Sequence, residues 1–155
     1  MSKLAHLNVI VLDKPDTKAY KRKCVGCLVL SRDKKIVLQQ RDNDCRSFPG
    51  RIATFGGGIK MGETPMQALV RELNEELGAK VKAKDVVTLG VLTEGETHHR
   101  ELVYVYFWHD KLGTITGCYE GKAKYCNDPS DVEKHPKVMN DVRWLLQECK
   151  KRKLL

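Results

Sequence analysis

The sequence predicts a mixed α/β domain in which helices cover both faces of a mixed β-sheet. Strand-like segments stand before and after a central amphipathic helix, an order typical of a sheet packed between helices. The chain has 155 residues, of which 41% are hydrophobic, and this size and composition suit one core. No internal repeat or low-complexity linker divides it, so we expect a single domain over residues 1–155.

The strands are predicted from runs of β-branched and aromatic residues bounded by turn residues. Before the central helix these runs are residues 24–31, residues 35–41 and the short "IATF" at 52–55, which leads into three glycines. After the helix they are residues 86–93 and 102–109. The polar stretches 41–51 and 94–101 are expected to be loops.

The rest of the chain is predicted as one long irregular region followed by a helix. Residues 111–138 are rich in Gly, Lys, Asp and Pro, which indicates mostly loop. Within residues 139–152 the apolar positions recur at helical spacing, which predicts a second helix there.

The central helix has clear start and stop signals. Thr64 is suited to the N-cap, Pro65 to the first helical position, and Gln67 completes a capping box. Gly78 is a natural terminator, so we expect a helix over residues 65–77. Its apolar positions share one face that should pack on the core: Met66, Leu69, Val70, Leu73 and Leu77.

Three acids, Glu72, Glu75 and Glu76, gather on another side of this helix in a chain with a net charge of +8. Such a cluster is usually a solvated face, but mutual repulsion at this spacing is relieved if a divalent cation is bound. Carboxylate oxygens are ligands that Mg²⁺ prefers. Glycines 56–58 upstream would let the backbone approach a metal or a phosphate closely.

Charge and cysteine content limit the other functions. The basic excess favours an anionic partner, although the cluster at 150–153 could equally complement a helix C-terminus. The spacing of the six cysteines favours free thiols over a disulfide or zinc site, and Cys24 and Cys27 fall in a predicted strand. With no signal-peptide pattern and no membrane-spanning stretch, we expect a cytoplasmic protein.

The stretch from Gly57 to Ala79 resembles the Nudix box, G-x5-E-x7-R-E-U-x-E-E-x-G-U, where U is a bulky aliphatic residue. The matching positions are Gly57, Glu63, Arg71, Glu72, Leu73, Glu75, Glu76 and Gly78. Ala79 departs at the last aliphatic position, and Phe55 stands where many relatives have proline. The resemblance implies the Nudix α/β/α sandwich.

The resemblance also implies a pyrophosphohydrolase that requires Mg²⁺, with Mn²⁺ as an alternative. Glu72, Glu75 and Glu76 would be metal ligands, with the carbonyl of Gly56 as a further one, and Glu72 or Glu75 could instead act on the water. Arg71 would orient an acid of the box. Glu63 would brace the loop.

Outside the box the residue roles are less specific. Many Nudix enzymes use another carboxylate from a later loop, and Glu120 is our choice over the competitors Glu94, Glu96 and Glu101. The expected substrate contacts are Gly57, Gly58, Arg41 and Phe48. The aromatic residues at 104, 106 and 108 could stack on a base or fill the core, and the histidines at 98 and 99 could touch substrate or simply belong to a loop.

The predicted substrate is a nucleoside triphosphate, converted to a monophosphate and pyrophosphate. The segment "TEGET" lacks the proline and tyrosine markers of the ADP-ribose and diadenosine-polyphosphate subgroups, and "MGETP" resembles MutT-type enzymes. The alternatives are a nucleotide sugar or other NDP-X compound, and a non-catalytic domain that binds nucleotide or RNA. Apart from this last alternative, nucleic acid is not an expected partner. Both a monomer and a homodimer are compatible with the sequence.

Overall fold

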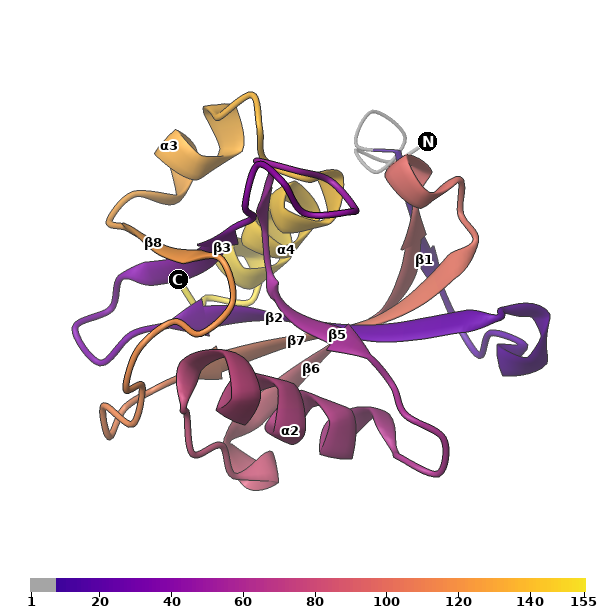
Figure 1. The fold of residues 1–155 in the computed structure, drawn as a ribbon, viewed down its shortest axis with the longest axis horizontal. Helices are drawn as coiled ribbons and strands as arrows, with labels where there is room; N and C mark the ends of the chain where they lie inside the picture. The colour runs from indigo at the N-terminus through magenta and orange to yellow at the C-terminus, as the bar shows by residue number, and fades with distance from the viewer. Residues whose placement is uncertain (1–7) are drawn as a thin grey trace.

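A computed structural model of the protein, described here for residues 8–155, shows eight strands in one mixed sheet (Figure 1). The strands follow the order β1-β6-β7-β2-β3-β4, while β5 pairs with β2 and β8 with β3. Their bounds are β1 Val9–Leu12, β2 Arg22–Leu30, β3 Ile36–Gln40, β4 Ile52–Ala53, β5 Phe55–Gly58, β6 Val86–Glu94, β7 Glu101–His109 and β8 Lys122–Cys126. The predicted mixed sheet is confirmed, because β2 and β7 run parallel and the other pairs run antiparallel.

The helices lie on the two faces of this sheet. The α-helices are α2 Pro65–Leu77, α3 Pro129–Lys134 and α4 Asn140–Lys151, and the short 3-10 turns are η1 Thr17–Ala19, η2 Ala83–Asp85 and η3 Gly95–Thr97. In Figure 1, α2 and α4 lie on opposite sides of the strands. The α/β/α arrangement expected from the sequence is therefore confirmed.

Each face of the sheet has its own core. Against α2 pack alternate residues of the central strands, among them Val25, Phe55 and Trp108, together with Leu69 and Leu73 of the helix. Against α4 pack the intervening residues, including Leu28, Leu38, Val105 and Phe107 of the strands and Val142, Leu145 and Leu146 of the helix. This alternation along β2 and β7 explains why both strands read as nearly continuous apolar runs.

Two details of the predicted elements need correction. Residues 111–138 are mostly loop, as expected, but they also contain two short elements that were not predicted, β8 and α3. β8 is weakly apolar and takes its hydrogen bonds from β3, a contact distant in sequence, and α3 is a six-residue helix capped by Asp128. The predicted single strand at 52–55 is divided between β4 and β5, with Thr54 outside both.

The cysteines and the aromatic stripe of β7 have structural roles. All six cysteines are free, and Cys24 and Cys27 are buried in β2, which confirms the expected free thiols. Tyr106 and Trp108 are 5% and 3% exposed under α2, so for these two the core alternative holds and base stacking does not. Among residues 8–155 no helix is long and apolar enough to cross a membrane.

Candidate active site

The glycines of β5 bring its backbone unusually close to β2 and to α2. Gly56 has φ +150°, and a Cβ placed on it would lie 2.0 Å from the carbonyl oxygen of Val25. A Cβ on Gly57 would lie 2.5 Å from Oε1 of Glu72. Any side chain at either position would therefore clash with backbone or with the acid, which is why the sequence needs glycine here.

The helix that carries the acids is fixed at both ends. Thr64 Oγ1 accepts from the backbone N–H of Gln67 at 3.1 Å, and the Gln67 side chain accepts from Thr64 N–H at 2.9 Å. At the other end Gly78 adopts the left-handed conformation, with φ 66° and ψ 11°. The predicted capping box, terminator and helix bounds are confirmed, and they set which way each acid points from α2.

Arg71 joins the outer part of the acidic cluster into one network. Its guanidinium donates to both carboxylate oxygens of Glu63, at 2.6 and 2.9 Å, and to the carbonyl of Gly58 at 3.0 Å. It also donates to Glu72 at 2.9 Å and Glu75 at 3.3 Å. The Arg71 hydrogen bonds lower the pKa of Glu63 to about 2. This geometry fits the expected roles of Arg71 in orienting acids and of Glu63 in bracing the loop.

Glu76 lies at the inner part of the cluster, where it is 2% exposed. Its Oε1 accepts from the backbone N–H of Gly56 at 2.9 Å, and its Oε2 accepts from Gln39 Nε2 at 3.1 Å. Burial raises its pKa to about 9, and the carboxylates of Glu120 and Glu72 add to the rise. A buried carboxyl crowded by two others is a place where a bound cation would lower the electrostatic cost.

The loop that carries Glu120 is attached to the C-terminal end of α2. Thr116 N–H donates to the carbonyl of Leu77 at 2.9 Å, and Tyr119 N–H donates to that of Glu76 at 2.8 Å. Gln39 Nε2 donates to the carbonyl of Glu120 at 2.9 Å as well as to Glu76. The structure thus brings Glu120 beside Glu76, as expected of the chosen later carboxylate.

Gln39 was missed by sequence reasoning. It is a buried polar residue, 4% exposed, in the otherwise apolar strand β3. That interruption of an apolar run was the available signal, but only the fold shows that its amide joins Glu76 to the Glu120 loop.

The competitors of Glu120 have other partners. Glu101 pairs with Arg22 and Glu96 with Arg51. Glu94 is 3% exposed, and its Oε2 accepts from the backbone N–H of Glu96 at 3.2 Å, while its Oε1 has no hydrogen-bond partner.

Glu94 and Glu96 form a second acidic cluster together with Asp141 at the start of α4. Burial raises the pKa of Glu94 to about 7, with Asp141 next in effect, and raises the pKa of Asp141 to about 6. Asn140 N–H donates to Glu96 Oε1 at 2.9 Å, which ties α4 to η3. Sequence reasoning considered these glutamates only as alternatives to Glu120 and missed their association with Asp141.

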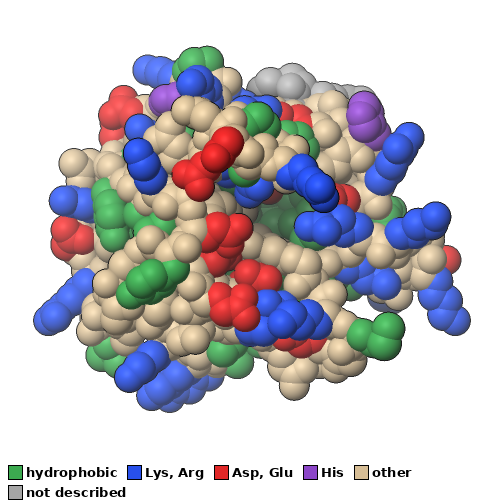
Figure 2. Space-filling view, viewed as in Figure 1, with side chains coloured by type: hydrophobic (Ala, Val, Ile, Leu, Met, Phe, Trp, Pro, Cys, Tyr) green, Lys and Arg blue, Asp and Glu red, His purple; other side chains and the backbone are tan. Residues whose placement is uncertain are grey.

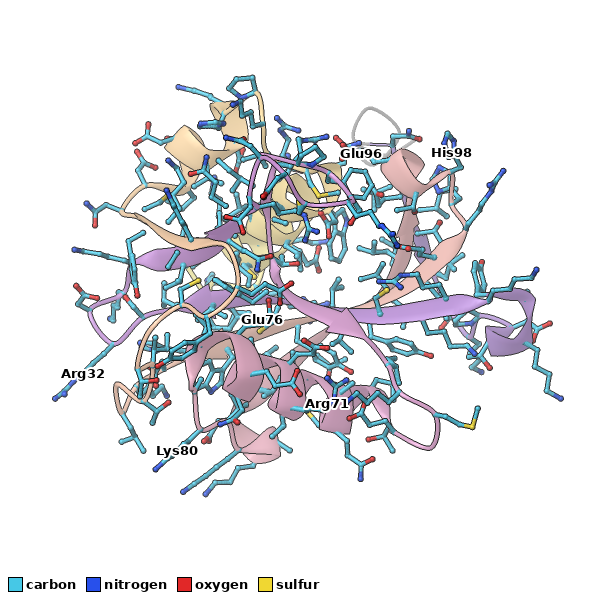
Figure 3. The ribbon with its side chains drawn as sticks, in the orientation of Figure 1. Arg32, Arg71, Glu76, Lys80, Glu96 and His98 are labelled. Atoms are coloured by element: carbon cyan, nitrogen blue, oxygen red, sulfur yellow. The ribbon has the colours of Figure 1, made fainter. Side chains whose placement is uncertain are left out.

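A hollow lies between the two acidic clusters. Figure 2 shows it near the middle of the viewed face, with acidic side chains along one side and basic ones along the other. In the same view Figure 3 places Glu76 and Arg71 below it and Glu96 above it. The candidate active site is the first cluster, which consists of the acids Glu63, Glu72, Glu75 and Glu76 together with the glycines of β5.

The expected substrate contacts are distributed unequally. Gly57 lies on β5 against Glu72, and the next residue, Gly58, accepts from Arg71 through its carbonyl. Arg41 donates to the carbonyl of Ser47 at 2.8 Å and lines a small cavity of about 70 Å³ that Glu120 also lines. Phe48 is half-buried and packs against the core cluster on the α4 side of the sheet, and its contact with substrate stays a prediction.

The acids do not yet form a ready-made metal cage. Within residues 8–155, no three His, Cys, Asp or Glu side chains are gathered in a way that would hold an ion. Glu72 and Glu75 are paired with Arg71, while Glu76 is bound to backbone and amide groups. The donor set nevertheless fits Mg²⁺, which prefers carboxylate oxygens. The raised pKa of Glu76 shows that its charged form is unfavourable here without a cation. Metal binding by these acids stays a prediction.

The chain is similar to known proteins over most of its length. A family model for the NUDIX domain matches residues 20–146. The CTP pyrophosphohydrolase of Escherichia coli is 31% identical over 125 residues, which cover 76% of this chain and 84% of that protein. The ADP-ribose pyrophosphatase of Methanocaldococcus jannaschii is 30% identical over 130 residues, 75% of this chain and 70% of that protein. The crystal structure of a MutT protein from Methanosarcina mazei superposes with a TM-score of 0.70 at 16% identity, covering 92% and 98% of the two chains.

Proposed function

The chain belongs to the NUDIX domain family, and from this premise we propose that it is a Mg²⁺-dependent pyrophosphohydrolase of nucleoside triphosphates. The products would be a nucleoside monophosphate and pyrophosphate. The observation that carries the proposal is the cluster of acids on α2, ordered by Arg71 and facing the close-packed glycines of β5.

The acids and the glycine backbone would hold the metal. Glu72, Glu75 and Glu76, with the carbonyl of Gly56, would be its ligands, and Mg²⁺ when bound supplies neutralisation of charge on the phosphoryl oxygens. Arg71 keeps the carboxylates of Glu72 and Glu75 in place through its hydrogen bonds to both. Its two further bonds to Glu63 prevent the guanidinium from turning away.

Glu120 is our candidate for the general base. It would accept a proton as the oxygen of water bonds to phosphorus and the P–O–P bridge breaks, so that the electron pair leaves with the departing phosphate. The bonds of its loop to Leu77 and Glu76 hold it at the end of α2. Gln39 fixes the backbone of Glu120 and the carboxyl of Glu76 together, so it acts as a positioning residue.

Two other functions stay as alternatives. A nucleotide sugar, ADP-ribose or another NDP-X compound is favoured by the similarity to an ADP-ribose pyrophosphatase. A domain that binds nucleotide or RNA without turnover would need no intact set of acids, and this chain keeps Glu72, Glu75 and Glu76. A cytoplasmic location and a homodimer remain predictions from the sequence.

An assay of product formation tests the proposal and separates these alternatives. The nucleotide products are separated by chromatography and quantified for nucleoside triphosphates, nucleotide sugars, ADP-ribose and dinucleoside polyphosphates, with Mg²⁺, with Mn²⁺ and after exhaustive chelation. We expect turnover of a nucleoside triphosphate that disappears on chelation and returns with Mg²⁺. If only an NDP-X compound is turned over, that class replaces nucleoside triphosphates as the proposed substrate. Full activity without a divalent cation would refute the metal assignment.

A further inference from the structure

A cavity of about 670 Å³ opens at the end of the sheet where β6 begins and β7 ends. Its volume is in the range of small-molecule sites. Five lysines from three separate segments line it: Lys80, Lys82, Lys84, Lys111 and Lys153. We call this cavity the lysine pocket. None of its lining residues belongs to the candidate active site, and in Figure 3 Lys80 lies below α2 while Glu76 lies above it.

The positive charge of the lysine pocket exceeds the negative charge that lines it. Two aspartates, Asp85 and Asp110, stand against the five lysines, which leaves an excess of three positive charges. Among residues 8–155, the only lysines in ion pairs are Lys35 and Lys150, and neither lines the pocket. Asp110 is 1% exposed, and its oxygens accept from the backbone N–H groups of Thr114 at 2.8 Å and Ile115 at 3.0 Å.

This excess has an electrostatic consequence. Five ammonium groups around one cavity repel one another, and a bound polyanion would turn that repulsion into attraction. The lysines are exposed, so they remain hydrated and able to reach a ligand. Part of the excess positive charge of the sequence therefore lies at this pocket, away from the acidic site on α2.

The pocket also offers apolar surface at its edge. Leu112 is 76% exposed there and Leu154 contributes to the wall, whereas Phe107 and Trp108 line the pocket with little exposed surface, 5% and 3%. An adjoining cavity of about 360 Å³ shares His109, Lys153 and Leu154 with the lysine pocket. A ligand with an apolar ring would lie against the two leucines while its charged groups reach the lysines.

We propose that the lysine pocket is a second binding site, for a nucleotide that carries two or more phosphate groups. Lysine binds phosphate as a point charge and needs no fixed geometry, which suits side chains arriving from three segments. The base would lie against Leu112 and Leu154. The volume fits one nucleotide better than a nucleic-acid strand, which would need an extended groove.

The test is a titration of the ¹⁵N-labelled full chain with the amide resonances followed individually. The probes are a non-hydrolysable nucleoside triphosphate analogue, inorganic pyrophosphate, sulfate and a short single-stranded RNA, at about 0.15 M salt to screen weak surface contacts. Chelator is present throughout, so the result does not depend on metal binding or hydrolysis at the other site. We expect saturable shifts at residues 80–85 and 110–114 with the analogue.

Matched variants separate a site from general basicity. The pocket variant replaces Lys82, Lys84 and Lys111 by Gln, and the control variant replaces the exposed Lys14, Lys18 and Lys134 by Gln, so both lose the same charge. The pocket variant should bind the analogue about tenfold more weakly, because three direct cation contacts are lost, and the control less than about twofold. Equal melting temperatures of the two variants would show that folding is not the cause.

Each outcome decides. Analogue binding tighter than pyrophosphate binding supports a nucleotide site, whereas equal binding of the two would overturn it in favour of a site that recognises the diphosphate group alone. Shifts that do not saturate, sulfate binding as well as the analogue, or equal losses in both triple variants would overturn the proposal. Saturable binding of RNA without binding of the analogue would also overturn it.

Discussion

The two ends of the acidic cluster on α2 differ in how their charge is balanced. At the outer end, Glu63 receives two hydrogen bonds from Arg71, and its pKa falls to about 2. At the inner end, Glu76 is buried beside Glu72 and Glu120, and its pKa rises to about 9. The Glu63–Arg71 pair is therefore already neutralised, while at the inner end the charged form of Glu76 is unfavourable until a cation binds.

The largest expected effect is at the inner end. Glu76→Gln keeps the shape of the side chain but cannot supply a carboxylate to the metal, and we expect kcat to fall by about 10³-fold, or roughly 4 kcal/mol of transition-state stabilisation. Glu75→Gln should also cause a large loss. Steady-state kinetics with Mg²⁺ and circular dichroism measure activity and fold; if both folded variants kept more than about a third of the activity, the metal assignment would be wrong.

The next effect concerns Glu120, which approaches the inner end from another loop. Glu120→Gln should lower kcat by about 10²-fold with little change in KM, as expected of a general base that acts in the transition state. The pH–rate profile should lose its acidic limb. Glu133→Gln on α3 is the control and should change neither rate nor profile. An unaltered profile and rate in Glu120→Gln would move attention to Glu96 or Glu101.

Arg71→Lys tests the outer end. Lysine keeps the positive charge but cannot donate two parallel bonds to Glu63 while also holding Glu72, so we expect kcat to fall by about tenfold. The pH dependence of unfolding follows from Glu63, whose lowered pKa adds stability above its ordinary value near 4.5 that is lost as pH falls toward about 2. Denaturant unfolding of the variant between these pH values should show a weaker decline. An identical decline in both proteins would argue against this pairing.

The smallest effect on catalysis is expected at Glu94, a buried acid that forms no ion pair with a basic residue among residues 8–155. Its pKa is about 7 when folded and near 4.5 ordinarily, so the native state holds the extra proton and stability should fall as pH rises through this window. Glu94→Gln removes that penalty and should be more stable than wild type at pH 8 by on the order of 1–3 kcal/mol, with little difference at pH 4.

Denaturant unfolding at the two pH values checks the Glu94 prediction. The exposed Asp44→Asn serves as the control and should leave the pH dependence unchanged. Asp141, whose pKa is about 6, contributes in the same direction, so a residual slope in Glu94→Gln is expected. A Glu94→Gln variant less stable than wild type at pH 8 would contradict the prediction.

The sequence alone determined the parts of this protein whose signals are local. The cap at Thr64, the terminator at Gly78 and the apolar stripe of α2 are set by neighbours within a turn or two, so the helix bounds were predictable. The box residues from Gly57 to Gly78 likewise lie in one short stretch, so the family and the acids could be recognised from it.

Only the tertiary structure decided what depends on contacts distant in sequence. β8 forms because β3 offers its edge, Tyr106 and Trp108 are buried because α2 covers them, and Gln39 reaches Glu76 across 37 positions. The lysines of the lysine pocket are also collected from separate segments. No local pattern encodes these pairings, because their free energy arises from surfaces that meet only after the sheet has assembled.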